Sequence, residues 1–246
     1  MSAIYAVFFG VSFLASIVGA ICGIGGGVII KPVLDAFGVL DVSAISFLSG
    51  CTVLAMSLYS VGRNKISGTS EVNMSTGTPL AIGAAVGGIA GKYIFQAIKG
   101  LFPDQNTVGA VQAMCLLVLT VLTLIYTIKK DKVKTYHLTN IPVCLSIGLL
   151  LGIFSSFLGI GGGPINLVIL YFFFSMSTKV AAQNSLYIIL FSQVTSLVVT
   201  IVTRTVPDVK WNVLIGMIIC GVLGGIVGRV FNKKIDRKST RLNSSH

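Results

Sequence analysis

Charged residues are scarce in this sequence: Asp, Glu, Lys and Arg together make up 10% of its 246 residues. Soluble domains carry about 25% charged residues and roughly 45–50% apolar ones, whereas 54% of this chain is hydrophobic. A soluble chain of this size could not bury so much apolar surface. The composition therefore excludes a soluble enzyme, a nucleic-acid-binding domain and a disordered segment, and it predicts a protein that uses the lipid bilayer as its solvent.

Histidine is also rare, with two residues, and no two of the five cysteines have the Cys-x-x-Cys spacing. Zinc sites and disulfide frameworks need such clusters. The motifs of ATP-binding loops, serine hydrolases and zinc proteases are missing as well. We therefore expect no metal site, no cofactor and no catalytic residue, so the protein is not expected to be an enzyme.

Nine apolar segments are separated by polar or Gly/Pro-rich breaks. Seven come near or above the ~20 residues that a helix needs to cross a bilayer. Segments 27–40 and 164–175 are shorter and are predicted to be half-helices or broken spans. The sequence thus predicts an all-α polytopic membrane protein with about seven to nine membrane elements. They lie at about 3–22, 27–40, 43–62, 75–99, 108–128, 140–158, 164–175, 179–204 and 211–231.

Two glycine motifs occur twice. Gly23-Ile24-Gly25-Gly26-Gly27 recurs as Gly159-Ile160-Gly161-Gly162-Gly163 at an offset of 136, and the segment 87–92 recurs as 224–229 at an offset of 137. Two motifs at nearly one offset indicate an internal duplication. If all nine elements cross, the copies start five elements apart and insert in opposite orientations, which predicts the inverted repeats of many secondary transporters.

The predicted organisation follows from this duplication. Residues 1–106 form membrane repeat 1, residues 107–139 form a connector helix with a basic cytoplasmic loop, and residues 140–238 form membrane repeat 2. The polar stretch 239–246 has no pattern and is predicted to be a non-native tail. If consecutive loops lie on opposite sides of the membrane, one side carries twelve basic residues and the other side carries three. The positive-inside rule places the first group in the cytoplasm, which predicts an inner (cell) membrane protein of a bacterium with an outside N-terminus and a cytoplasmic C-terminus.

Each Gly-Ile-Gly-Gly-Gly motif stands between a long and a short apolar segment, with a proline nearby. Glycine tolerates backbone conformations that side chains forbid, and proline interrupts helical hydrogen bonding, so a helix break is expected at each motif. The helix that follows begins with free N–H groups and a partial positive charge, which suit an anion. The alternative is close helix packing through small residues. The candidate substrate-binding glycines are Gly23, Gly25, Gly26, Gly27, Gly159, Gly161, Gly162 and Gly163.

Neutral polar side chains follow both motifs. Ser49 lies on a serine face of the third segment, and Gln183, Asn184 and Ser185 open the eighth segment. Asn166 comes three residues after the second glycine motif, and its alternative role is to cap the helix break there. Hydroxyl and amide groups at these positions can line a path for an anion, or they can form hydrogen bonds between helices.

Three basic residues fall within or beside the apolar segments. Lys31 follows the first glycine motif and is a candidate for neutralising an anionic substrate. Its alternative role is snorkelling towards the membrane interface. Lys92 and Arg229 occupy matching positions in the two copies and are expected to be interface anchors.

These motifs resemble the TauE/SafE family of bacterial membrane proteins, also called the toluene sulfonate uptake permease family. The resemblance covers about residues 8–232 and rests on both glycine motifs and on the segments 43–49 and 180–185. It implies a transporter of sulfur-containing or carboxylated anions, such as sulfite, sulfoacetate or another sulfonate. It leaves open whether the anion is exported or taken up.

We therefore expect a secondary transporter that binds a small anion between two broken helices and works by alternating access. Two alternatives remain: an anion channel on the same fold, and a non-transporting membrane subunit or scaffold. The expected partners are a small anionic substrate and the lipid bilayer, with no nucleic acid. A homodimer is left open.

Overall fold

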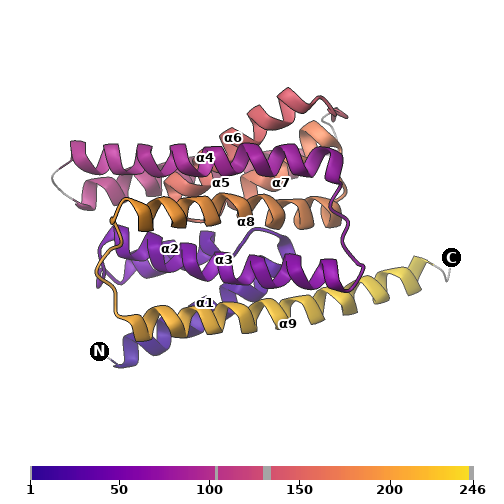
Figure 1. Ribbon diagram of the computed structural model, residues 1–246. Helices are drawn as coiled ribbons and strands as arrows, with labels where there is room; N and C mark the ends of the chain where they lie inside the picture. The colour runs from indigo at the N-terminus through magenta and orange to yellow at the C-terminus, as the bar shows by residue number, and fades with distance from the viewer. Residues whose placement is uncertain (1, 103–104, 130–133, 244–246) are drawn as a thin grey trace.

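The computed structural model describes residues 2–102, 105–129 and 134–243, with side chains for residues 4–102, 107–129 and 134–232. This part of the chain forms nine α-helices and no strand (Figure 1), so the predicted all-α fold is confirmed. Each predicted apolar segment corresponds to one helix. The helices are α1 (Ser2–Cys22), α2 (Gly27–Ala36), α3 (Val42–Ile66), α4 (Met74–Leu101), α5 (Gln105–Lys129), α6 (Ile141–Leu158), α7 (Gly163–Phe174), α8 (Thr178–Val202) and α9 (Trp211–Asn243).

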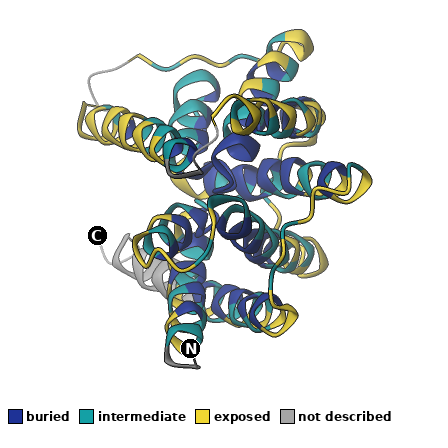
Figure 2. Cartoon of the chain, turned by 90° about the vertical axis from the view of Figure 1, so that its left-hand side faces the viewer, coloured by how far each residue is buried: buried dark blue, intermediate teal, exposed yellow. Residues whose placement is uncertain are grey.

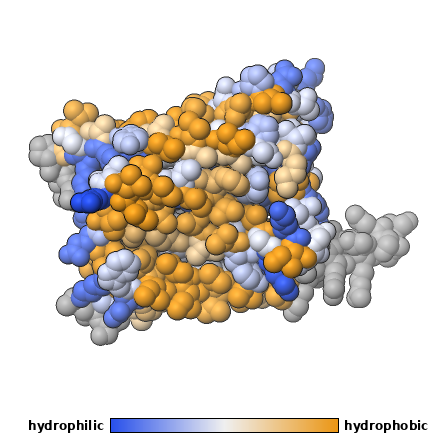
Figure 3. Space-filling view, viewed as in Figure 1, coloured by the Kyte–Doolittle hydropathy of each residue, from blue (hydrophilic) through white to orange (hydrophobic). Residues whose placement is uncertain are grey.

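Seven of these helices are long and apolar enough to cross a membrane. The other two, α2 and α7, have 10 and 12 residues. At 1.5 Å per residue they extend about 15 and 18 Å, roughly half of a ~30 Å hydrocarbon core. Figure 3 shows apolar side chains over the middle of one face of the bundle and hydrophilic ones gathered at its two ends, as a membrane-spanning protein requires.

The long helices pack in two groups that meet along α3 and α8. In one group α9 packs on α1 and α3, and in the other α4 packs on α6 and α8. The helices α3 and α8 contact each other where the groups meet (Figure 1). Buried residues lie on the inward faces of the helices, and the outward faces are exposed (Figure 2). The α3–α8 pair is therefore the centre of the molecule.

Glycines allow the closest helix contacts. A methyl carbon on Gly87 would lie 2.1 Å from the carbonyl oxygen of Leu149, and one on Gly224 would lie 2.4 Å from that of Phe13. Only glycine fits at either position, because small residues let the backbones of two membrane helices touch. The repeated motif at 87–92 and 224–229 thus packs α4 on α6 and α9 on α1.

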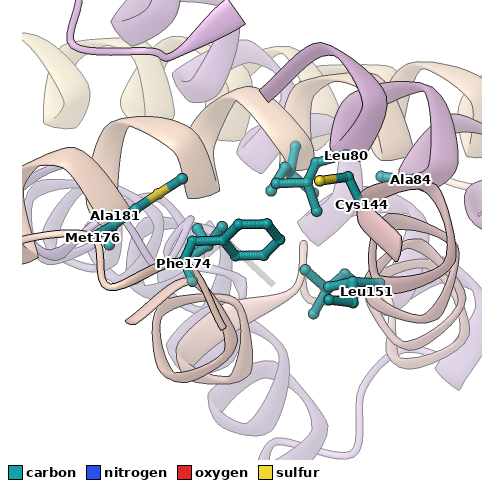
Figure 4. Packing of buried hydrophobic residues seen from close by; sticks show 10 residues of the cluster. Leu80, Ala84, Cys144, Leu151, Phe174, Met176 and Ala181 are labelled. Atoms are coloured by element: carbon teal, nitrogen blue, oxygen red, sulfur yellow. The ribbon is translucent and has the colours of Figure 1, made fainter. Parts of the chain in front are cut away.

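An apolar cluster fixes the end of α7. The Phe174 ring is 7% exposed and points towards Leu80 of α4 and Cys144 of α6, with Leu151 beside them (Figure 4). Because these side chains come from different helices, the short α7 is held in one position by its last residue. The other end of α7 carries the second glycine motif.

The last helix is longer than the sequence suggested. The apolar segment ends near 231, but α9 continues to Asn243 because no glycine or proline follows Gly228 to interrupt it. The stretch interpreted as a tail, 239–246, begins inside this helix, and its last three residues lie outside the described residues.

Candidate functional site

The two glycine motifs separate helices at equivalent places. The helix α1 ends at Cys22 and α2 begins at Gly27, while α6 ends at Leu158 and α7 begins at Gly163. Seven of the motif glycines have positive φ angles, between 48° and 91°. Residues with a Cβ avoid this region of backbone space. Glycine is therefore required for the chain to turn here.

The two glycine loops touch each other in the centre of the bundle. A methyl carbon on Gly27 would lie 2.2 Å from the carbonyl oxygen of Ile160, and one on Gly163 would lie 2.4 Å from Val28 Cγ2. Both glycines are buried. The fold thus brings together two segments that are 136 residues apart in the sequence.

Two apolar side chains close the space around these loops. A methyl carbon on Gly25 would lie 3.2 Å from both Val53 of α3 and Ile189 of α8, and one on Gly161 would lie 2.6 and 3.3 Å from the same two side chains. Val53 and Ile189 are fully buried. We call Gly25, Val53, Gly161 and Ile189 the central seal.

The short helices begin beside this seal with uncapped N-termini. Their N-cap residues, Gly26 and Gly162, have no side-chain cap, so the first N–H groups carry the partial positive charge of the helix end. The Asn166 amide lies next to Gly162, is fully buried, and has no hydrogen-bond partner for either amide atom among the described residues. This amide can donate to a bound anion.

Ser49 of α3 and Ser185 of α8 are further buried groups without partners. Both side chains are fully buried, and neither hydroxyl has a hydrogen-bond partner in the described part of the chain. Most buried polar groups in proteins are paired, and an unpaired hydroxyl in apolar surroundings is costly. These two serines therefore stay candidates for contact with a substrate.

One polar cavity of about 30 Å³ lies between the beginning of α3 and the end of α8. A neighbouring cavity of about 400 Å³ shares Lys92 and Phe95 with it. The Lys92 ammonium lies 5.3 Å from the centre of the Phe95 ring. We call this region the Lys92 mouth. Its polar lining includes Ser43, Ser46, Lys92, Lys99, Gln193, Ser196, Thr200 and Thr205.

A second polar cavity, of about 120 Å³, lies between the end of α3 and the beginning of α8. On α3, Ser60 in this cavity is 14 residues beyond Ser46 in the other, or about 21 Å along the helix. Val53 stands midway between these serines. We call this second region the Arg229 mouth, and its polar lining is Ser60, Asn64, Thr69, Lys179, Gln183, Arg229 and Asn232.

The two mouths are built from equivalent positions. Each of the ten residues that line the Arg229 mouth has a counterpart 136 or 137 residues away that lines the Lys92 mouth. Ser60 corresponds to Ser196, and Arg229 corresponds to Lys92. The sequence duplication therefore reappears as two matching cavities, one on each side of the central seal.

Lys31 lies beside the Lys92 mouth, where its partner Ser46 packs against Gly159 of the second glycine loop. Its side chain is 3% exposed, and its ammonium donates to Ser46 Oγ at 3.0 Å and to the Gln112 side chain of α5. This burial contradicts the alternative in which Lys31 snorkels to the interface. Its charge lies directly behind a serine that lines the Lys92 mouth.

Two other predicted site residues, Gln183 and Asn184, have their hydrogen bonds away from the glycine loops. Gln183 lines the Arg229 mouth and accepts a hydrogen bond from the Glu71 backbone at 2.8 Å. Asn184 donates to the Val180 carbonyl at 2.8 Å, and its amide oxygen lies beside Gly77 of α4. The predicted set is thus divided between the central loops, the two mouths and a helix contact.

A family model described as Sulfite exporter TauE/SafE matches residues 8–243. The chain belongs to the TauE/SafE family. It is 23% identical over 246 residues to the "Probable membrane transporter protein YunE" of Bacillus subtilis (strain 168), and the match covers 92% of this chain and 88% of that protein. No solved structure matches the chain significantly. The predicted resemblance is confirmed, and the protein is a multi-pass membrane transporter of the TauE/SafE family.

Sequence reasoning missed part of the site in this TauE/SafE protein. Val53 and Ile189 resemble any other apolar residue of a membrane helix, so nothing marked them as a seal. Lys92 and Arg229 were expected to be interface anchors, although their matching positions were visible in the sequence. Both side chains line the mouths.

Proposed function

We propose that this protein is a secondary transporter of a small anion, which crosses between the Lys92 mouth and the Arg229 mouth along the α3–α8 interface. The observation that carries the proposal is the pair of matching polar cavities on opposite sides of one apolar seal. A channel needs a continuous path, whereas a transporter opens one side at a time. Alternating access then requires the central seal to break towards each mouth in turn.

Matched contacts support inverted repeats as the basis of this movement. Gly87 meets Leu149 and Gly224 meets Phe13, and both members of the second pair are displaced by 136 or 137 residues from those of the first. The corresponding helices α3 and α8 run in opposite directions (Figure 1). Two copies with the same contacts and opposite directions can exchange conformations, which is how inverted repeats alternate access.

The chemistry of the path favours an anion. Basic side chains stand at both mouths, and two uncapped helix N-termini with the Asn166 amide lie at the centre. Such N–H donors replace the water that an anion loses when it enters a protein. Together with the family description, this supports a sulfur-containing substrate such as sulfite, sulfoacetate or another sulfonate.

The distribution of charge supports a single orientation in a bacterial inner membrane. Basic residues of the 63–74 and 134–139 segments and Lys179 lie at the end of the bundle where α3 finishes. The positive-inside rule assigns this end to the cytoplasm. In this orientation the Arg229 mouth faces the cytoplasm, the Lys92 mouth faces outside, and the N-terminus is outside.

Flux measurements in proteoliposomes test the proposal. Gly25→Ala and Gly161→Ala place a methyl group inside the central seal, and we expect each to lower sulfite or sulfoacetate flux by at least about tenfold. Gly38→Ala is the matched control, since Gly38 also has a positive φ of 59° but nothing lies within 4 Å of the added carbon. All three variants carry the backbone cost of about 1–2 kcal/mol, so near-normal flux in the first two would refute a role for the seal.

The same assay separates the alternatives. Flux that saturates and shows counterflow supports a transporter. Flux that shows neither saturation nor counterflow supports an anion channel. A membrane subunit or scaffold predicts no intrinsic flux of any anion by the purified protein. Nothing in the geometry of the two mouths favours the scaffold.

A further inference from the structure

The loop 67–73 joins α3 to α4 and is hydrogen-bonded to side chains that line the Arg229 mouth. Gln183 accepts from the backbone N–H of Glu71 at 2.8 Å and donates to the carbonyl oxygen of Thr69 at 3.3 Å. Arg229 Nη2 donates to the hydroxyls of Ser67 at 3.1 Å and Thr69 at 3.4 Å. Residues of α8 and α9 that line the cavity therefore also hold this loop.

The same loop places a carboxylate against a residue that lines the mouth. Glu71 Oε1 lies 2.8 Å from Lys179 Nζ, and the two side chains are 36% and 50% exposed. Lys179 is the second residue of α8 and lines the cavity. The positive charge at this mouth is thus already paired with an anion that belongs to the chain itself.

Arg229 has a donor that this pairing does not use. Its Nε–H is buried and has no acceptor among the described residues, although arginine offers five N–H donors in all. Within the described residues, its Nη2 donates to neutral oxygens of Arg63, Ser67 and Thr69. Among the described residues, two cations and one carboxylate give a surplus of positive charge beside a cavity of about 120 Å³.

We infer that the Arg229 mouth is an anion subsite for carboxylates and sulfonates, and that Glu71 is a tethered competitor for it. An incoming carboxylate or sulfonate takes Lys179 from Glu71 and accepts from the unused N–H of Arg229. The loop 67–73 then loses its ion pair, which links anion arrival to release of the loop. The inference rests on the proposed function, since it treats this mouth as one entrance of the transport path.

Calorimetry on the purified full chain in detergent tests the inference, with sulfoacetate as the probe. Glu71→Gln removes the competitor, and an exposed ion pair is worth a small amount, so we expect Kd to fall about two- to fivefold. Lys179→Gln should raise Kd. When Glu71→Gln is added to Lys179→Gln, Kd should not fall, because the cation for which Glu71 competes is already absent. Asp208→Asn is the matched control, because Asp208 is an exposed acid in the loop at the opposite end of α8; its Kd should equal that of the unmodified protein.

An unchanged or higher Kd in Glu71→Gln overturns the inference, and so does an equal gain in Asp208→Asn or the absence of any sulfoacetate binding. Flux in the same variants separates this inference from the proposed function. Saturable flux without any effect of Glu71→Gln overturns the tethered competitor and leaves the transporter intact. Tightened binding without flux supports the subsite and overturns the transporter.

Discussion

The Lys92 mouth and the Arg229 mouth occupy equivalent positions but differ in charge. The Lys92 mouth has two lysines, Lys92 and Lys99, and no acidic residue in its described lining. The Arg229 mouth also has two cations, but Glu71 reaches it from the α3–α4 loop and pairs with one of them. The Lys92 mouth therefore offers an anion a stronger field.

This difference shows what duplication fixes and what it leaves free. Duplication fixes backbone positions, so Ser60 and Ser196 line equivalent cavities and Arg229 stands where Lys92 stands. Charge depends on single residues outside the repeated motifs. Glu71 in one loop is enough to make the charge of two similar entrances unequal without any change of fold.

The largest expected effect concerns the seal, which belongs to neither mouth. Ile189→Ala and Ile188→Ala remove the same atoms from adjacent, fully buried positions of α8, and each should cost about 2–5 kcal/mol of stability. Only Ile189 contacts both glycine loops. We therefore expect anion leak through liposomes with Ile189→Ala and none with Ile188→Ala, together with similar losses in thermal stability. Equal leak in both variants would mean that loosened packing, and not a seal, controls the path.

The next largest effect separates the two mouths. Arg229→Gln and Lys92→Gln each remove a charged donor, and a hydrogen bond to a charged group is worth about 1.5–3 kcal/mol. We expect apparent affinity to fall about tenfold for anion added on the side of the altered mouth and to stay unchanged on the other side. Initial rates in right-side-out and inside-out vesicles measure both values.

Charge-preserving variants are the control for this pair. Arg229→Lys and Lys92→Arg keep the positive charge and should recover most of the affinity. A loss on both sides from either Gln variant would contradict two separate entrances.

The helices were predictable because their signal is local. Long apolar segments interrupted by glycine motifs place every helix, and the offset of 136 predicts which loops correspond. The extension of α9 beyond 231 was missed because hydropathy measures burial in lipid and not helix formation. A polar segment without glycine or proline continues a helix into water.

The site was predictable only where backbone chemistry determines it. The glycine loops needed no knowledge of side-chain direction, and they lie at the centre. Gln183 and Asn184 were grouped because they are adjacent, but successive residues of a helix point about 100° apart. One therefore faces the Arg229 mouth and the other faces α4. Side-chain direction across a bundle depends on neighbours that a single sequence does not reveal.

The smallest expected effect tests a residue that breaks the repeat. The counterpart of Lys31 is Leu167, so Lys31→Leu makes the two copies alike at this position. The Lys31 ammonium reaches the Lys92 mouth through Ser46. Because this charge does not touch the anion directly and is screened by protein and water, its removal should change the affinity for the anion by about threefold. We expect this loss for anion added at the Lys92 mouth only, measured in the same oriented vesicles.

Stability provides the control for that variant. Lys31→Leu leaves the Gln112 amide oxygen without its donor, while Gln112 Nε2 still donates to the Phe157 carbonyl. An unpaired buried acceptor costs about 1–3 kcal/mol, and removal of a buried charge partly offsets this cost, so we expect Lys31→Leu to remain folded with a small loss in thermal stability. Because folding is then preserved, an equal loss of affinity on both sides would place the influence of Lys31 at the shared centre, and the asymmetry between the mouths would rest on Glu71 alone.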